Sequence, residues 1–271
     1  MKMKPLIAVL GVTLCLSGCI IKVSQASQPS LTSSKTLTLD AENIDQLMTT
    51  TGAGELSIRG VRGQQDVRIV ADIHSYDGIE PNLSLKQVGN KAKLVADFDH
   101  LSSSFFQTSP YVNLVVTVPD SFSLDIDDGS GLIDIDRIDG NIKINDGSGS
   151  IRVLGGNDIK IHDGSGSINL DKSTGSIDIT DGSGGITVND AHGSLNIDDG
   201  SGSIELKQIG GDTKINDGSG SIYVRHVNGK VTIDDGSGGI DVEHTNGLEI
   251  IESGSGSVRF KHINGLVSVD D

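Results

Sequence analysis

From residue 121 to the C-terminus, apolar and polar residues alternate in short runs, and the same two runs return at a regular interval. In the repeat that spans 218–235, Ile222 and Val224 belong to the first run, and Val231 and Ile233 belong to the second. Alternation with a period of two is typical of a β-strand with one buried face. Because such short strands are not stable alone, we expect each to pair in parallel with its equivalent in the next repeat, about 4.8 Å away.

Two kinds of chain breaker separate the runs. The tetrapeptide Asp-Gly-Ser-Gly precedes the first run, begins at Asp128, Asp146, Asp163, Asp181, Asp199, Asp217 and Asp235, and is replaced by Ser-Gly-Ser-Gly at 253–256. A glycine precedes the second run at Gly140, Gly175, Gly193, Gly211, Gly229, Gly247 and Gly265, and Asn157 takes this place in the repeat that is one residue shorter than the others. We expect this glycine column to adopt positive φ, which glycine and asparagine tolerate.

The starts of the tetrapeptides give a fixed period of about 18 residues, which predicts a solenoid. We therefore expect an all-β protein, a parallel β-solenoid (β-helix) with eight coils over 121–271. The predicted core comprises Ile133/Ile135, Ile151/Val153, Ile168/Leu170, Ile186/Val188, Ile204/Leu206, Ile222/Val224, Ile240/Val242 and Val258/Phe260 from the first runs, and Ile142/Ile144, Ile159/Ile161, Ile177/Ile179, Leu195/Ile197, Thr213/Ile215 and Val231/Ile233 from the second. Glu249 falls on an apolar position, which predicts a bulge around Leu248–Ile251 that points Glu249 outward.

The pattern extends towards the N-terminus. Residues 52–63 fit the same template, so the region 36–120 is expected to begin the solenoid. Further strands are predicted at Asp66–Asp72, Asn82–Lys86, Ala92–Phe98 and Tyr111–Val118, where they would hide the open end of the core. Residues 19–35 are rich in Ser and Gln and are predicted to form a tether.

Residues 1–18 are typical of a secretory signal peptide, since two lysines precede the uncharged apolar stretch Leu6–Leu16. That stretch is too short to span a bilayer. The sequence Leu-Ser-Gly-Cys at 16–19 resembles the bacterial lipobox, which implies cleavage before Cys19 and lipidation of its thiol. Several acyl chains on one residue hold a protein at a membrane. With Ile20 after the lipid site, the usual sorting pattern predicts an outer-membrane lipoprotein that faces either the periplasm or the exterior.

The net charge of the chain restricts the classes of partner that it can bind. Without Lys2 and Lys4, 19 basic residues remain against 37 acidic ones, a net charge of −18. Such a surface repels nucleic acid and attracts cations, so no nucleic-acid partner is expected. Aromatic residues are scarce, with no Trp, three Tyr and five Phe, which argues against a deep sugar-binding cleft.

The motif Gly-Ser-Gly-Ser-Ile alternates with Asn-Gly, as in the stretch His262-Ile263-Asn264-Gly265, and a Val-Thr-Val-Pro step at 116–119 precedes the repeats. In these motifs, residues 36–271 resemble the bacterial putative adhesins of the "head GIN" type and related domains of unknown function. The resemblance implies a cell-envelope β-solenoid of the pectin-lyase-like kind that lacks the catalytic residues of that fold. It supplies no functional residues for this chain.

The seven aspartates of the tetrapeptides are the first candidate site. Stacked in a solenoid, they would form a row that we call the aspartate ladder (Asp128, Asp146, Asp163, Asp181, Asp199, Asp217 and Asp235). Neighbouring carboxylates about 5 Å apart repel by roughly 3 kcal/mol at an effective dielectric of 20. We expect backbone N–H groups of the following Gly-Ser-Gly, in Asx turns, and exposure to water to offset this repulsion. The alternative is weak Ca²⁺ binding along the ladder; no other cofactor is expected.

Two further candidates lie outside this row. His226, His244 and His262 recur at the interval of the repeat and would form one column. Imidazole is a common transition-metal ligand, but side chains in a line do not converge on a tetrahedral site, so solvated corner residues are the preferred interpretation. Phe105 and Phe106 lie in a polar, non-repeating stretch and form a candidate contact tip for a partner or membrane; the alternative is that they fold over the end of the core.

The sequence contains no Gly-x-Ser-x-Gly, His-Glu-x-x-His, Cys-x-x-Cys or P-loop motif. Residues 121–271 also lack the long loops that build a catalytic groove. We therefore expect a non-enzymatic, lipid-anchored envelope protein, an adhesin or scaffold whose solenoid displays a binding surface to an envelope protein or glycan. The alternatives are a Ca²⁺-responsive envelope stability or signalling module and an enzyme that acts on polysaccharide.

Overall fold

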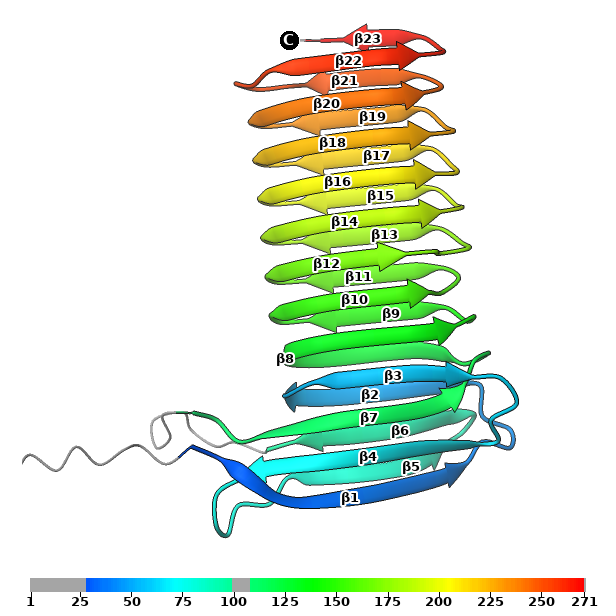
Figure 1. Cartoon of the computed structure of the whole chain (residues 1–271), viewed down its shortest axis with the longest axis vertical. Helices are drawn as coiled ribbons and strands as arrows, with labels where there is room; N and C mark the ends of the chain where they lie inside the picture. The colour runs from blue at the N-terminus through cyan, green and yellow to red at the C-terminus, as the bar shows by residue number, and fades with distance from the viewer. Residues whose placement is uncertain (1–27, 99–107, 271) are drawn as a thin grey trace, which may run out of the picture.

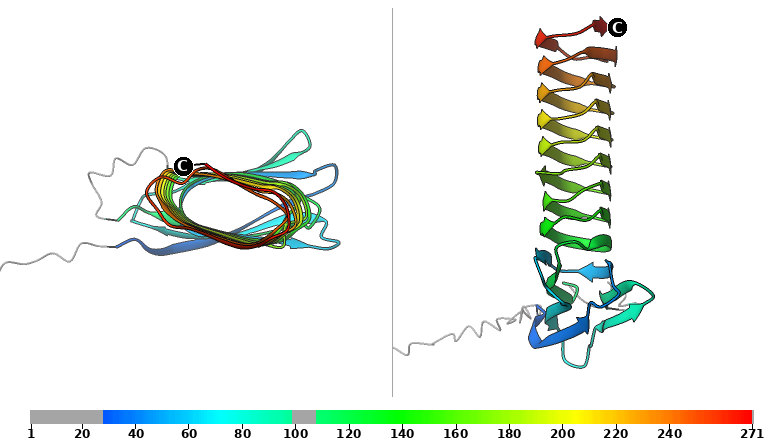
Figure 2. Two further views of the ribbon diagram at one scale, coloured as in Figure 1. Left: turned by 90° about the horizontal axis from the view of Figure 1, so that it is seen from above. Right: turned by 90° about the vertical axis from the view of Figure 1, so that its right-hand side faces the viewer.

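The computed structural model describes residues 28–98 and 108–270, and this part of the chain contains strands and no helix. The strands stack into a tall, flattened coil with an oval cross-section (Figures 1 and 2). It is a parallel β-solenoid of about eight turns with coils of about 18 residues and extra N-terminal strands, as the sequence predicted.

Two sheets form the long walls of the coil. Sheet A contains, in spatial order, β1 (Ser30–Asp40), β4 (Asp66–Ser75), β7 (Tyr111–Pro119), β3 (Leu56–Val61), β8 (Ser123–Ile138), β10 (Gly149–Gly155), β12 (Gly166–Asp171), β14 (Gly184–Ala191), β16 (Gly202–Ile209), β18 (Gly220–Val227), β20 (Gly238–Thr245) and β22 (Val258–Ile263). Sheet B contains β5 (Asn82–Val88), β6 (Lys91–Asp97), β2 (Gln46–Ala53), β8, β9 (Ile142–Asp146), β11 (Ile159–Asp163), β13 (Ile177–Asp181), β15 (Leu195–Asp199), β17 (Thr213–Asp217), β19 (Val231–Asp235), β21 (Leu248–Glu252) and β23 (Val267–Val269). The long strand β8 bends from sheet B into sheet A.

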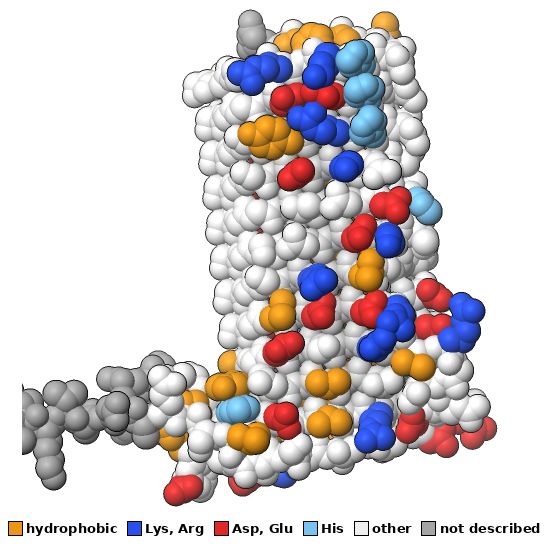
Figure 3. Space-filling view, in the orientation of Figure 1, with side chains coloured by type: hydrophobic (Ala, Val, Ile, Leu, Met, Phe, Trp, Pro, Cys, Tyr) orange, Lys and Arg blue, Asp and Glu red, His pale blue; other side chains and the backbone are white. Residues whose placement is uncertain are grey.

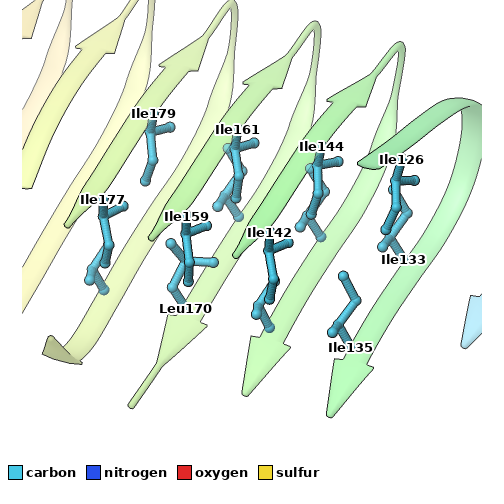
Figure 4. Close-up of a cluster of buried hydrophobic side chains, with 14 of the residues drawn as sticks. Ile126, Ile133, Ile135, Ile142, Ile144, Ile159, Ile161, Leu170, Ile177 and Ile179 are labelled. Carbon is cyan, nitrogen blue, oxygen red and sulfur yellow. The ribbon is translucent and has the colours of Figure 1, made fainter. Parts of the chain in front are cut away.

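Equivalent residues of successive coils lie beside each other in register. Ile151, for example, pairs with Ile133 on one side and with Ile168 on the other. The inward isoleucines therefore form continuous rows between the two sheets, as Figure 4 shows for Ile142, Ile144 and their neighbours. This in-register burial of apolar side chains is the main source of stability that the repeat supplies.

The core contains one inward column more than the sequence analysis predicted. Ile138, Ala191, Ile209 and Val227 are buried, and Ser173 and Thr245 occupy the same column in other coils. Each of them follows a residue with left-handed backbone geometry, which interrupts the simple alternation of inward and outward side chains. The apolar residue three positions after the second inward residue of several first runs, as at Ile138, Ala191, Ile209 and Val227, is the signal that reveals this column.

The glycine column does not have positive φ, so that prediction was wrong. The positive φ at this corner belongs to the residue three positions earlier, or two positions earlier in the short coil. We call this set the left-handed column: Arg137, Gly155, Lys172, Asp190, Gln208, His226, His244 and His262. The glycines are required because the coils approach closely. A Cβ atom on Gly193, for example, would lie 2.3 Å from the carbonyl oxygen of Gly175.

The bulge predicted near Glu249 is confirmed. Leu248 and Ile250 are buried and Glu249 points outward, while the register between β19 and β21 shifts beyond Ile233. Ile251 is the extra residue and is exposed. In the last coil, however, Phe260 was predicted to be inward and is 45% exposed, because within the described residues β22 pairs with a neighbour on one side only.

The N-terminal region extends both sheets with antiparallel strands. β2 and β3 form a coil that stacks directly on β8, and beyond it β4–β7 in sheet A and β5–β6 in sheet B close the end of the core. Figure 1 shows this cap at the end of the rod opposite β23. β1 begins at Ser30 and pairs with β4, so residues 30–35 are a strand and not part of a tether, because their backbone completes the edge of sheet A.

Candidate functional site

The aspartate ladder lies at the third inward position of each sheet B strand. Asp146, Asp163 and Asp181 pair in register, and the row continues to Asp235. All seven side chains are buried, with 5% or less of each residue exposed. The expectation that water would offset their repulsion was therefore wrong, since the alternation of the strand carries each carboxyl group into the interior.

One oxygen of each carboxyl group has a partner. From Asp146 to Asp235, Oδ1 accepts a hydrogen bond from the backbone N–H of the serine two residues later, at 3.0–3.2 Å. This is the Asx turn that the tetrapeptide predicted. Asp128, at the N-terminal end of the row, accepts from the hydroxyl of Thr51 instead. The second oxygen, Oδ2, is buried without a hydrogen-bond partner in all seven residues.

Burial also changes the acidity of the ladder. Desolvation raises the pKa of Asp146, Asp163 and Asp199 to about 6, with repulsion from neighbouring ladder aspartates as a further cause, and backbone N–H groups oppose the shift. Desolvation likewise raises the pKa of Asp128, Asp181, Asp217 and Asp235. The ladder therefore favours protonated carboxyl groups over carboxylates to an extent that surface aspartates do not.

The three histidines of the left-handed column form a stack. The ring centroids of His226 and His244 are 4.7 Å apart, and those of His244 and His262 are 4.5 Å apart. Figure 3 shows this column of imidazoles beside charged side chains of both signs on sheet A. Loss of solvent around the ring, and then repulsion from His262 and His226, lowers the pKa of His244. The rings lie side by side and do not point at a common centre.

Within residues 28–98 and 108–270, no group of three or more His, Cys, Asp or Glu side chains is arranged to hold a metal ion. The same part of the chain has no helix long and apolar enough to cross a membrane. Cys19 and the pair Phe105 and Phe106 lie outside the described residues, so lipidation and the contact tip stay predictions.

A shallow hollow on the outer face of sheet B is a site that sequence reasoning missed. It has a volume of about 880 Å³ and crosses successive coils from Asp45 to Asn196. A smaller hollow of about 290 Å³ shares Ser194 and Asn196 with it and continues to Thr232. We call the two together the sheet B groove. The hollow is open because the residues at the start of each sheet B strand have short, polar side chains. This column in the sequence could have indicated the hollow: Ser123, Asn141, Asp158, Ser176 and Ser194.

The floor of the sheet B groove carries paired charges and amides. The Nζ atom of Lys143 lies 3.3 Å from Asp125 Oδ1, and that of Lys160 lies 2.9 Å from Asp178 Oδ2. Asn196 donates to the other oxygen of Asp178, and these two partners lower the pKa of that carboxyl group. The groove therefore offers both donors and acceptors along the axis of the rod, and its lysines pair with aspartates of neighbouring coils.

Comparison with known proteins gives structural likeness alone. No protein-family model and no curated protein sequence matches the chain. The chain is similar to a "putative adhesin" from Parabacteroides distasonis, with a TM-score of 0.50 and 12% identity over 84% of this chain and 97% of the other. This likeness shows a shared fold and extends over nearly the whole of the solved structure.

More distant similarities were also found. A "putative cell adhesion protein" from Clostridium sporogenes matches with a TM-score of 0.32 and 11% identity over 87% of this chain and 99% of the other. A "putative lipid binding protein" from Parabacteroides distasonis matches with a TM-score of 0.33 and 14% identity over 88% and 98%.

Proposed function

We propose that the protein is a non-enzymatic, lipid-anchored component of the cell envelope whose solenoid provides a rigid binding surface. One observation supports this proposal above the others. The residues that repeat in every coil are used inside the structure, whereas the outward residues that line the sheet B groove differ from coil to coil. Differences along the outer face are what a specific contact surface requires.

The proposed location rests on the N-terminal sequence and on the position of the cap. A lipid on Cys19 would hold the capped end of the rod near the membrane, since β1 begins at Ser30 beside the cap. The eight coils would then project by about 38 Å at about 4.8 Å per coil. The adhesin name of the structural relative fits this arrangement, and adhesion at the cell surface is part of the proposal.

The sheet B groove favours an extended, polar partner. It follows the axis of the rod, and its lining of Asp, Lys, Asn and Ser side chains offers hydrogen bonds along its length, while Leu124, Ile142, Ile159 and Ile177 add apolar surface. The backbone of a β-solenoid face is held by the strand register, so little backbone conformational entropy is lost when a partner binds. A long glycan or an extended protein segment of the envelope has the required shape.

Crosslinking on intact cells, followed by mass spectrometry, tests this function. We expect partners to be captured by probes placed along sheet B, and the Lys160→Glu variant to lose most of this capture because it reverses a charge in the groove. Arg152→Glu is the matched control, since Arg152 is an exposed cation on sheet A that pairs with Asp134. Equal capture by the wild type and by Lys160→Glu would contradict the proposed surface.

A further inference from the structure

The seven buried Oδ2 atoms of the aspartate ladder are the strongest unexplained feature of the described chain. Each is an acceptor without a donor, and they recur in consecutive coils along one line. A buried acceptor that lacks a partner is costly, and a buried charge is more costly still. Seven repetitions of the same cost require that something stabilise the row.

A metal ion does not fit this geometry. Ca²⁺ takes six to eight oxygen ligands in proteins. From Asp146 to Asp235, Oδ1 of the ladder aspartate accepts from a serine N–H, and Oδ1 of Asp128 accepts from Thr51. From Asp128 to Asp217 the backbone carbonyl accepts from the N–H of the glycine one coil further on, as in Gly164 to Asp146. One free oxygen per coil remains, so two adjacent coils offer a cation two buried ligands and no access to water.

The N-terminal end of the ladder indicates what the row requires. There the residue in register with Asp128 is Thr51, and its hydroxyl donates to the aspartate. At the other end, Ser253 replaces the aspartate of the tetrapeptide and is also buried. Hydroxyl groups therefore flank the row, while inside it each aspartate has only other aspartates in register. A protonated carboxyl group is the donor that such a row can supply from itself.

We propose that the aspartate ladder binds protons, so that neighbouring carboxyl groups share them along the interior of the rod and the solenoid becomes more stable in mild acid. The direction in which stability changes with pH follows from the raised pKa values, because the folded state favours the protonated form of the ladder. The stabilisation is complete below the unfolded pKa of about 4 and is lost as the pH rises through the folded pKa of about 6.

The titratable groups around the ladder do not oppose this dependence of stability on pH. The flanking titratable residues are Asp127, His162, Asp198, Asp234 and Glu252 on sheet B. Asp127 and Asp234 raise the pKa of the ladder residues next to them. The sheet A strands β10, β12, β14, β16, β18 and β20, which follow the corners from Asp146 to Asp235, begin with Gly-Ser or Gly-Gly, so their first two residues bring no titratable group to the ladder. Among the described residues, no lysine or arginine is one of the groups that shift the pKa values of the ladder.

Thermal unfolding of the full chain in the presence of EDTA tests the proposal. We expect the melting temperature to be higher at pH 5 than at pH 7.5 by about 5 °C or more. Asp199→Asn, which keeps the acceptor and supplies a donor in place of Oδ2, should raise the melting temperature at pH 7.5 and reduce this difference. Asp198→Asn is the control, because it removes the same charge from the adjacent, exposed residue. It should leave the difference between the melting temperatures at pH 5 and pH 7.5 unchanged.

A second measurement keeps the test independent of the variants. Carboxyl ¹³C NMR of the wild-type chain should show a set of aspartates that titrate near pH 6, apart from the exposed ones. The proposal is overturned if the melting temperature rises from pH 5 to pH 7.5, or if all aspartates titrate near pH 4. It is also overturned if 1 mM Ca²⁺, added in place of EDTA, raises the melting temperature and Asp199→Asn abolishes that rise, since the ladder would then bind metal.

Discussion

The two corners of each coil differ in how much their sequences vary from one coil to the next. The corner formed by Asp-Gly-Ser-Gly, which we call the aspartate corner, keeps one sequence in seven coils. The corner that contains the left-handed column accepts Arg, Gly, Lys, Asp, Gln or His at the same backbone position. At the aspartate corner the side chains face inward or meet the backbone of the next coil, whereas in the left-handed column the side chain points to solvent. Repetition therefore marks physical constraint in this fold, and it does not mark a reactive centre.

Substitution of a glycine in the aspartate corner should give the largest effect. A Cβ atom on Gly184 would lie 1.5 Å from the carbonyl oxygen of Gly166, and its φ is +147°. We expect Gly184→Ala to lower the free energy of unfolding by about 3 kcal/mol or more, measured by denaturant unfolding. Gly185→Ala, one residue later, has open space around its Cβ and should change stability by less than about 0.5 kcal/mol. Similar losses in both variants would show that close approach of the coils is not the constraint.

A core substitution away from either corner provides the next comparison. Ile204 is fully buried between equivalent residues of the adjacent coils. Ile204→Ala should cost about 2–5 kcal/mol if the thin core cannot collapse around the cavity, but it should leave the backbone register intact. Unfolding by denaturant measures the loss of stability. Amide hydrogen exchange of residues 186–188 and 222–224, in the adjacent coils, shows whether the loss of protection spreads. Loss of protection in one coil alone would contradict a continuous core.

The left-handed column should respond in the opposite direction. Gln208 has a φ of 59°, which is unfavourable for residues other than glycine. Gln208→Gly should therefore stabilise the protein by about 0.5–1 kcal/mol, after the greater entropy of the unfolded glycine chain is taken into account. Glu205→Gly, in the middle of β16, should destabilise it by a similar amount. Equal destabilisation by both would mean that the corner does not store backbone strain.

The smallest expected effect concerns the histidine stack. Because His262 helps to lower the pKa of His244, His262→Asn should move that pKa back towards its ordinary value. A ¹H–¹⁵N NMR titration of the imidazole rings measures the shift. An unchanged His244 pKa would show that loss of solvent accounts for the whole effect.

The fold could be predicted from the sequence because the period and the alternation describe a single coil, and every other coil repeats it. The inward isoleucines and the bulge at Glu249 follow from that alternation alone. The burial of the ladder could not be read in the same way, because an aspartate at the end of a strand is normally assigned to a solvated turn. The structure shows that β9 continues as far as Asp146, so the alternation that buries Ile142 and Ile144 also turns Asp146 inward.

The sheet B groove was missed, and the role of the glycine column was misassigned, for a related reason. Both depend on the space between neighbouring coils, and a pattern along the chain contains no distances. Gly229 and Gly265, each preceded by Asn, suggested positive φ values because that is the usual role of Asn-Gly. The contact of their Cα atoms with the preceding coil appears only when the coils are stacked.

The central claim is that the coils stack in parallel and in register, which buries the repeated isoleucines and aspartates and leaves the varied residues on the surface. Two spin labels in the outward column of sheet A, at Arg152→Cys and Asp241→Cys in a chain that also carries Cys15→Ser and Cys19→Ser, test it most directly. These positions are linked through five in-register steps. Electron paramagnetic resonance should therefore give a narrow distance distribution centred at about 24 Å, which is five strand spacings. A broad distribution, or a distance far from five strand spacings, would contradict the stacked solenoid and every role assigned to its corners.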